Sequence, residues 1–247
     1  MPKRKEQFIT GEIYHLIIRA IDNNLIFKDE DDYFRGIFSI YEFNNQKPIS
    51  IFLRRRYRAV EKKREKKLKD IGSPTIIFPE DKRNKFVEIL VFCFMPNHIH
   101  LLVRQLKDGG ISKFMQKVGI GLSKYFNRKH KRKGHVFQDA FRSVHIENDN
   151  QLITVVNYIH INPILIIEPN FKEQGIKDPE KTIKFLEEEF RWSSLFDYLG
   201  KGNFKSVTER GFVLDLLGGI EGCKNLLRDR IFYKKISKNN KEIFLEK

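Results

Sequence analysis

The sequence predicts an α+β fold, in which an antiparallel sheet packs against helices on one face. Some short segments are rich in β-branched and aromatic residues, as strands are, whereas others repeat their apolar residues every three or four positions, as amphipathic helices do. These segments follow one another as strand, helix, hairpin, helix and strand. That order suits a two-layer sandwich better than a doubly wound parallel sheet.

The first predicted strand spans residues 12–20 and ends at a turn-prone Asp-Asn-Asn segment. A helix is expected from about 30 to 44, because an acidic cluster begins at Asp29 and carboxylates favour a helix N-terminus. Residues 50–85 then hold a dense block of charged residues and a Gly-Ser-Pro turn. We therefore expect an exposed, charged insertion in this region.

Two strongly apolar segments, 86–95 and 98–103, are separated by a Pro-Asn turn and predict a β-hairpin of two buried strands. A helix is expected from about 113 to 130, with Ser112 as its N-cap and Tyr125 on its apolar face.

Residues 135–147 predict a further strand, and 151–161 predict a helix that a proline ends. Another helix is expected near 179–189, before a basic tail. We therefore expect a core of residues 1–165 and a C-terminal helical extension, with the tail, from 166 to 247.

The chain carries 47 Lys and Arg against 32 Asp and Glu, a formal net charge of +15. An excess this large favours a polyanionic partner, because each neutralised phosphate releases condensed counterions. A lysine-rich surface that only keeps the protein in solution is the alternative. Charge alone leaves the two alternatives about equal, so nucleic acid needs support from the chemistry of a site.

Only two cysteines are present, Cys93 and Cys223, which suits a reducing compartment and excludes a cysteine-based zinc site. The N-terminus lacks the apolar stretch of a signal peptide, and no run approaches the roughly 20 apolar residues that a membrane span needs. These features predict a cytoplasmic protein with no membrane partner.

His98 and His100 are two residues apart in a predicted strand, so their side chains leave the same face of the sheet. Two neutral imidazoles placed side by side can share one divalent cation. A pair of this kind is weak on its own, since incidental or structural histidines would give the same pattern.

The string Phe-Met-Pro-Asn-His-Ile-His-Leu-Leu-Val over residues 94–103 resembles the HUH signature of the REP-associated tyrosine transposases, relatives of the single-tyrosine transposases of small bacterial insertion sequences. Further family landmarks follow in the right order, and the resemblance spans most of residues 10–220. These landmarks are Tyr14-His15, the segment 123–138, the segment 157–163, and Arg191-Trp192-Ser193-Ser194.

The resemblance implies a ferredoxin-like or RRM-like core whose central strands carry the histidine pair. It implies that His98 and His100 hold Mg²⁺ or Mn²⁺ and that a tyrosine on a neighbouring helix attacks a phosphodiester of single-stranded or hairpin DNA. A 5′-phosphotyrosine and a free 3′-hydroxyl result, so strands are exchanged without an external energy source. A monomer is favoured because of the C-terminal extension, although relatives that exchange tyrosine helices make a dimer possible.

Carried over residue by residue, the family's nucleophile matches Tyr125. A tyrosine on an apolar helix face is ordinarily a core residue, so packing is the alternative role. Tyr158 is the main competitor as nucleophile. We expect Tyr158 and His160 to be structural, because the segment around them resembles a packing motif at the end of a helix.

Several residues are candidates for the third metal ligand. In relatives, a polar residue about one helical turn past the tyrosine can complete the metal site, and here that position is Lys129, a poor ligand while protonated. Asn127, His130 or water could serve instead, and Lys129 could contact the phosphate. The other histidines, His15, His135 and His145, are expected at the surface or behind the metal ligands.

A basic cluster with aromatic residues interleaved suits a single strand whose bases stack while its phosphates are neutralised. A solvated basic loop is the alternative. The cluster comprises Arg128, Lys131, Arg132, Lys133 and Arg142.

Two other functions remain open from the sequence. One is a domesticated nucleic-acid-binding protein with the same fold and little or no turnover. The other, less favoured, is a metal-dependent hydrolase, which would need a carboxylate that the hairpin turn does not provide.

Overall fold

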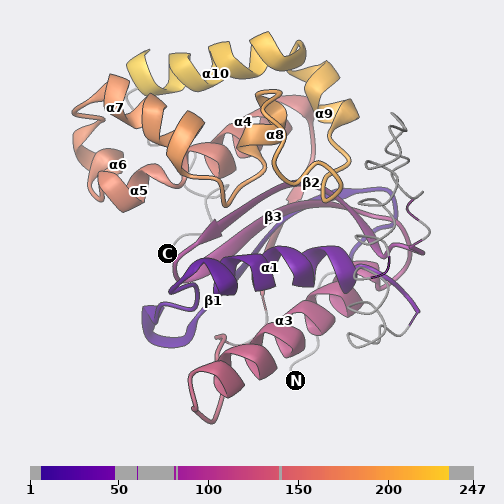
Figure 1. The fold of residues 1–247 in the computed structure, drawn as a ribbon. Helices are drawn as coiled ribbons and strands as arrows, with labels where there is room; N and C mark the ends of the chain where they lie inside the picture. The colour runs from indigo at the N-terminus through magenta and orange to yellow at the C-terminus, as the bar shows by residue number, and fades with distance from the viewer. Residues whose placement is uncertain (1–6, 48–59, 61–80, 82, 139–140, 234–247) are drawn as a thin grey trace, which may run out of the picture.

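The computed structural model describes residues 7–47, 60, 81, 83–138 and 141–233 (Figure 1). Most of the predicted charged insertion at 50–85, and the basic tail from Lys234, lie outside the described residues.

A four-stranded antiparallel sheet forms the centre of the fold, as the sequence predicts. Its strand order is β2-β3-β1-β4, with β2 at Val87–Met95, β3 at His98–Gln105, β1 at Ile13–Arg19 and β4 at Arg142–Ile146. The predicted hairpin is confirmed as β2 and β3. The last strand is shorter than the predicted 135–147, since Phe137 forms only an isolated bridge with Ala20.

Helices cover both faces of the sheet, whereas the sequence-based expectation placed them on one (Figure 1). On one face lie α1 (Glu30–Glu42) and α3 (Gly110–Lys129), and on the other lies α4 (Asp149–Ile161). The physical reason is visible in the strands, because β1, β2 and β3 are buried along almost their whole length on both sides.

The structure agrees with one predicted helix start and corrects another. Asp29 accepts a hydrogen bond from the backbone N–H of Asp32 at 3.0 Å and caps α1. The predicted N-cap of α3 at Ser112 is wrong: the helix begins earlier, after Gly109, whose φ of +66° favours glycine.

The C-terminal extension is a series of helices that share the hydrophobic core on the α4 face. The predicted helix at 179–189 is split into a regular helix and a π-helical turn. The elements are α5 (Ile164–Ile167), α6 (Phe171–Gln174), α7 (Pro179–Lys184), η2 (Phe185–Glu189), α8 (Leu195–Tyr198), α9 (Gly211–Leu216) and α10 (Gly219–Tyr233).

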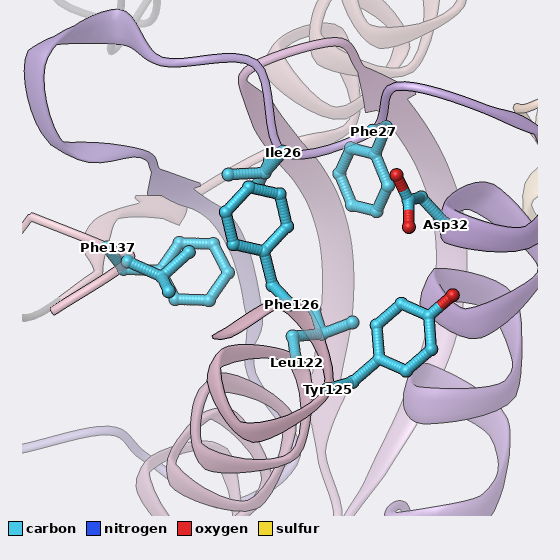
Figure 2. Close-up of a pocket in the computed structure, with 8 residues that line it drawn as sticks. Ile26, Phe27, Asp32, Leu122, Tyr125, Phe126 and Phe137 are labelled. Carbon is cyan, nitrogen blue, oxygen red and sulfur yellow. The ribbon is translucent and has the colours of Figure 1, made fainter. Parts of the chain in front are cut away.

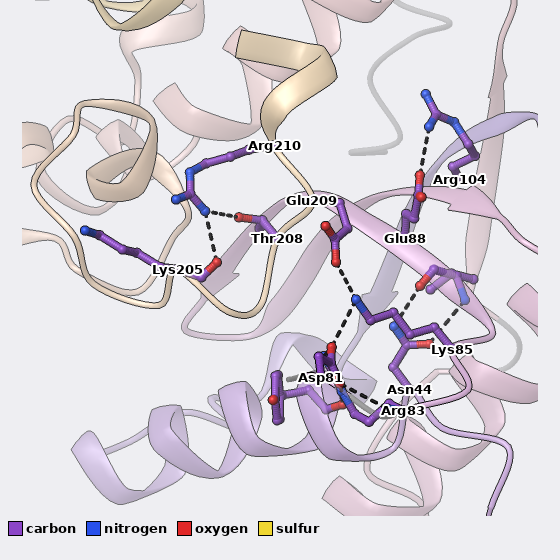
Figure 3. Close-up of polar contacts among 12 residues, drawn as sticks. Asn44, Asp81, Arg83, Lys85, Glu88, Arg104, Lys205, Thr208, Glu209 and Arg210 are labelled. Carbon is purple, nitrogen blue, oxygen red and sulfur yellow. Dashed lines mark hydrogen bonds and ion pairs between the residues drawn. The ribbon is translucent and has the colours of Figure 1, made fainter. Parts of the chain in front are cut away.

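The extension is also fastened to β2 by polar contacts. The backbone N–H of Phe94 donates to the carbonyl of Trp192 at 2.9 Å, and that of Ser194 donates to the carbonyl of Phe92 at 3.0 Å, so this segment lies along the outer edge of the strand. Figure 3 shows a second tie, in which Lys85, just before β2, pairs with Glu209.

The segment 149–167, which joins α4 and α5, is long and apolar enough to cross a membrane by length and composition alone. In the fold, however, 61% of it is buried inside the protein. Since α4 packs against β2, β3 and α10, we interpret it as a core helix.

Gly36→Ala is expected to destabilise the protein by about 1–3 kcal/mol, because a Cβ there would lie 2.5 Å from Cε1 of the fully buried Phe94. Urea denaturation measures the change. Gly119→Ala is the matched control, since its Cβ would lie 3.5 Å from Ile18 and loss of a helix glycine should stabilise by about 0.5–1 kcal/mol. If Gly36→Ala were as stable as the wild type, this close packing of α1 on β2 would be contradicted.

Candidate metal and nucleophile site

The histidine pair lies on the face of the sheet that α4 covers. His98 and His100 are 4% and 0% exposed, and their Nε2 atoms are 3.0 Å apart. Two ligands at about 2.1 Å from one cation and at right angles to each other would be separated by about 3.0 Å, so this spacing fits a shared divalent ion of octahedral preference.

The hydrogen bonds behind the pair allow the same interpretation. Oδ1 of Asn97 lies 2.6 Å from Nδ1 of His98 and can only accept, so Nδ1 carries the hydrogen and Nε2 keeps a lone pair. Nδ1 of His100 lies 3.0 Å from Nε2 of the buried His15. When His15 accepts from His100, both Nε2 lone pairs face the same point, where a cation would offset their repulsion.

Both histidines are held neutral. Burial, followed by the charge on Lys172 and then that on Arg19, lowers the pKa of His100 to about 3. The pKa of His98 is also well below its usual range, through burial first, then His100, Arg19 and Lys172. Neutral imidazole is the form that ligates a metal.

His15→Phe should weaken Mn²⁺ binding by about 10- to 100-fold, because phenylalanine keeps a ring beside His100 but cannot accept its hydrogen bond. Titration followed by electron paramagnetic resonance measures the affinity. His145→Phe is the control, because His145 of β4 lies outside the histidine site and pairs with Glu12 at 2.9 Å. Equal affinities in both variants would rule out this role for His15.

The tyrosine beside the pair is Tyr158 of α4. Its ring centre is 5.6 Å from that of His100, nearly perpendicular to it, and 6.0 Å from that of His15. Burial raises the pKa of the Tyr158 phenol, while the nearby Asn162 side chain and the charge on Arg19 act in the opposite direction. Asn162 lies four residues after Tyr158, directly after the end of α4, and is fully buried.

Three cations surround this site. The charge on Arg19, at the end of β1, affects both histidines and Tyr158. Arg142 on β4 is close enough to lower the pKa of Arg19, after burial. Lys172, on α6, has its Nζ 5.3 Å from the centre of the Tyr158 ring. Such a site is suited to an anionic ligand.

Tyr125 is not brought to the histidine pair, which corrects the sequence-based choice of nucleophile. Its neighbours on α3, Leu122 and Phe126, pack in the core on the opposite face of the sheet, with Ile99 and Leu101 of β3. Because side chains of a strand alternate between faces, the sheet separates Tyr125 from His98 and His100. Figure 2 shows Tyr125 directed toward α1 and Asp32.

The three alternatives for the third ligand lie with Tyr125 at the end of α3, so the structure corrects them as well. Nδ2 of Asn127 donates to the carbonyl of Gly134 at 2.8 Å. The ammonium of Lys129 pairs with Asp32 at 2.7 Å and also with Asp29, and His130 lies 3.6 Å from Asp32.

The predicted DNA-binding residues are divided by the fold. Arg142 lies beside the histidine site on β4 and is exposed. The others follow or end α3, on the face that carries Tyr125, and are exposed or half-buried: Arg128, Lys131, Arg132 and Lys133.

His160 contacts the C-terminal extension, whereas Tyr158, two residues before it, lies beside the histidine pair. Nε2 of His160 lies 3.0 Å from Oγ of Ser194, and burial lowers its pKa to about 3. The two side chains leave α4 on different sides, since they are two residues apart along a helix.

Sequence reasoning missed Asn162, Arg19 and Lys172. One signal for Asn162 was present: it stands one helical turn past Tyr158, the spacing at which Lys129 follows Tyr125. Within the described residues, no group of three or more His, Cys, Asp or Glu side chains could hold a metal ion. A third ligand drawn from the described residues would therefore be of another type, and a carboxamide oxygen such as that of Asn162 suits a hard cation.

Comparisons with known proteins show which family and which solved structure this chain resembles. The model of the IS200-like transposase family matches residues 43–162, a range that contains His98, His100, Tyr158 and Asn162. The chain is therefore similar to the IS200-like transposase family over this segment.

Among solved structures, a REP-associated tyrosine transposase bound to a REP hairpin matches with 15% sequence identity and a TM-score of 0.46. The match covers 82% of this chain and 88% of that chain. The comparison with curated proteins gives no match.

Proposed function

We propose that the protein is a metal-dependent transesterase that cleaves and rejoins single-stranded DNA at hairpin-forming repeats, with Tyr158 as the nucleophile. His98 and His100 would hold Mg²⁺ or Mn²⁺, and Asn162 is the proposed third ligand. A bound cation supplies charge that polarises the scissile phosphate. The observation that carries the proposal is the position of Tyr158 against two buried histidines whose Nε2 atoms are 3.0 Å apart.

The reaction is a phosphoryl transfer. The Tyr158 oxygen forms a bond to phosphorus as its proton passes to water, and the bond from phosphorus to the 3′-oxygen breaks. The departing 3′-oxygen takes a proton from water and leaves as a hydroxyl. In the return step a 3′-hydroxyl attacks the phosphotyrosine and releases Tyr158. Asn162, four residues after Tyr158, would orient the phenol, and Arg19 and Arg142 would bind the phosphates on either side.

The DNA would therefore lie along the end of the sheet where β1 ends and β3 begins, since Arg19 is opposite His98 in the register of these strands. We propose that the protein acts as a monomer in the cytoplasm. The basic residues at the end of α3 could bind a flanking duplex or strand through its phosphates.

The test is incubation with a pool of hairpin oligonucleotides labelled at either end, with Mn²⁺ or with EDTA. We expect a covalent protein–DNA band that requires the metal, and only the label on the 3′ side of the cut should remain on the protein. Attachment of the 5′ side would contradict the proposed polarity. Binding of hairpins without any covalent band would favour a DNA-binding protein without turnover.

A further inference from the structure

The described residues contain a cation at the site that comes from the C-terminal extension and not from the sheet. Lys172 lies on α6, a four-residue helix, and its Nζ is 5.3 Å from the centre of the Tyr158 ring. Its charge is among the causes that lower the pKa of both His98 and His100, after burial. One ammonium thus lies near the proposed nucleophile and both proposed ligands.

Burial disfavours the protonated form of Lys172 at this position. The pKa of Lys172 is lowered to about 8, mainly by burial. The neighbouring Glu173 raises this pKa and Arg19 lowers it, each by less than burial does. A divalent ion on the histidines would add further positive charge. A phosphodiester with its negative oxygens would reverse this balance and stabilise the protonated lysine.

The route by which a phosphate could enter the site also involves Lys172. Tyr158 is only 5% exposed and His100 is fully buried, so a phosphate can reach them only from a side where side chains are able to move. Lys172 is half-buried and belongs to a short helix, and a lysine stem has several rotatable bonds. Its ammonium can turn from the tyrosine ring to an entering phosphate.

We propose that Lys172 is a catalytic residue, whose ammonium binds a non-bridging oxygen of the scissile phosphate and offsets the charge that builds there as Tyr158 attacks. Lys172 keeps its proton throughout, so it adds no step to the transfer. This inference rests on the proposed function, and it gives the C-terminal extension a part in the chemistry.

The experiment compares single-turnover rates of adduct formation on the hairpin that the wild type cleaves best. Lys172→Met is expected to react about 100-fold more slowly, the usual effect of removing one donor that stabilises transition-state charge. Its affinity for Mn²⁺ should be equal to or higher than that of the wild type, because a repelling charge is lost. Lys177→Met is the matched control, an exposed lysine five residues further on, and should react normally.

Restoring the charge distinguishes chemistry from packing. Lys172→Arg should recover part of the rate, and Lys172→Cys alkylated with 2-bromoethylamine should recover more, with treated wild type as the control because Cys93 and Cys223 are buried. A Lys172→Met variant that reacts at the wild-type rate, or that loses metal affinity in parallel with rate, would overturn the assignment. If the wild type forms no adduct at all, both the proposed function and the role of Lys172 are contradicted. If the wild type forms the adduct and Lys172→Met reacts at the same rate, only the role of Lys172 is contradicted.

Discussion

Tyr158→Phe should abolish the covalent protein–DNA adduct, with a loss in rate of at least about 10³-fold, because removal of a covalent nucleophile eliminates the reaction path. The variant should fold normally, since the ring that packs at 5.6 Å from His100 is retained. Denaturing gel electrophoresis of protein incubated with labelled hairpins and Mn²⁺ measures the adduct, and thermal melting checks the fold.

Tyr125→Phe is the matched control, because it removes the same hydroxyl from a helix on the other face of the sheet. We expect it to form adduct at close to the wild-type rate. An adduct that persists in Tyr158→Phe and disappears in Tyr125→Phe would mean that the nucleophile reaches the histidines from the other face, for example from a second copy of the chain.

His98→Ala should lose both metal binding and adduct formation, because a single remaining imidazole is a weak site for Mg²⁺ or Mn²⁺. The expected loss in rate is at least about 10³-fold, which corresponds to several kcal/mol of transition-state stabilisation from the cation. EDTA should reduce the wild-type rate to the same level. Titration of Mn²⁺ and the single-turnover rate are measured on the same preparation.

Two further variants control for loss of folding and for nonspecific effects of removing a histidine. His98→Asn preserves a polar side chain if the alanine variant melts early, and it should still lose most of the rate. His145→Ala removes a histidine that is outside the site and pairs with Glu12, so it should be normal. Full activity of His98→Ala in EDTA would show that the reaction needs no cation at the pair.

The hairpin could be predicted from the sequence because its signals are local. The strand residues 86–95 and 98–103 alternate or run apolar around a Pro-Asn turn, and they form β2 and β3 nearly as expected. The same pattern placed His98 and His100 on one face, and the structure agrees. Residues of one strand share a face by geometry alone, whatever the rest of the fold does.

Which tyrosine lies beside the histidines could not be predicted from the sequence, because it depends on long-range placement. Periodicity assigned Tyr125 and Tyr158 each to an amphipathic or apolar helix, but it does not tell which face of the sheet a helix covers. That is decided by the connections, which send α3 to one face and α4 to the other. The poor ligand at Lys129 was a sign in the sequence against Tyr125, and Asn162 is the alternative that we propose.

Lys172 was out of reach of sequence reasoning for a related reason. It lies on a helix of only four residues, with no periodicity to predict it, and it reaches Tyr158 through the fold and not through any spacing. Extensions of this kind show their role only when their packing is known.

The segment around Trp192 and Ser194 has a consequence for association. This segment forms hydrogen bonds with the backbone N–H of Phe94 and the carbonyl of Phe92. It therefore occupies the outer edge of β2, to which another chain could otherwise add a strand. The other outer strand, β4, has only five residues, and its exposed Arg142 adds positive charge that repels a second copy. The sheet is thus protected against open-ended growth between molecules, which would suit a protein that must stay dispersed along a nucleic-acid polymer.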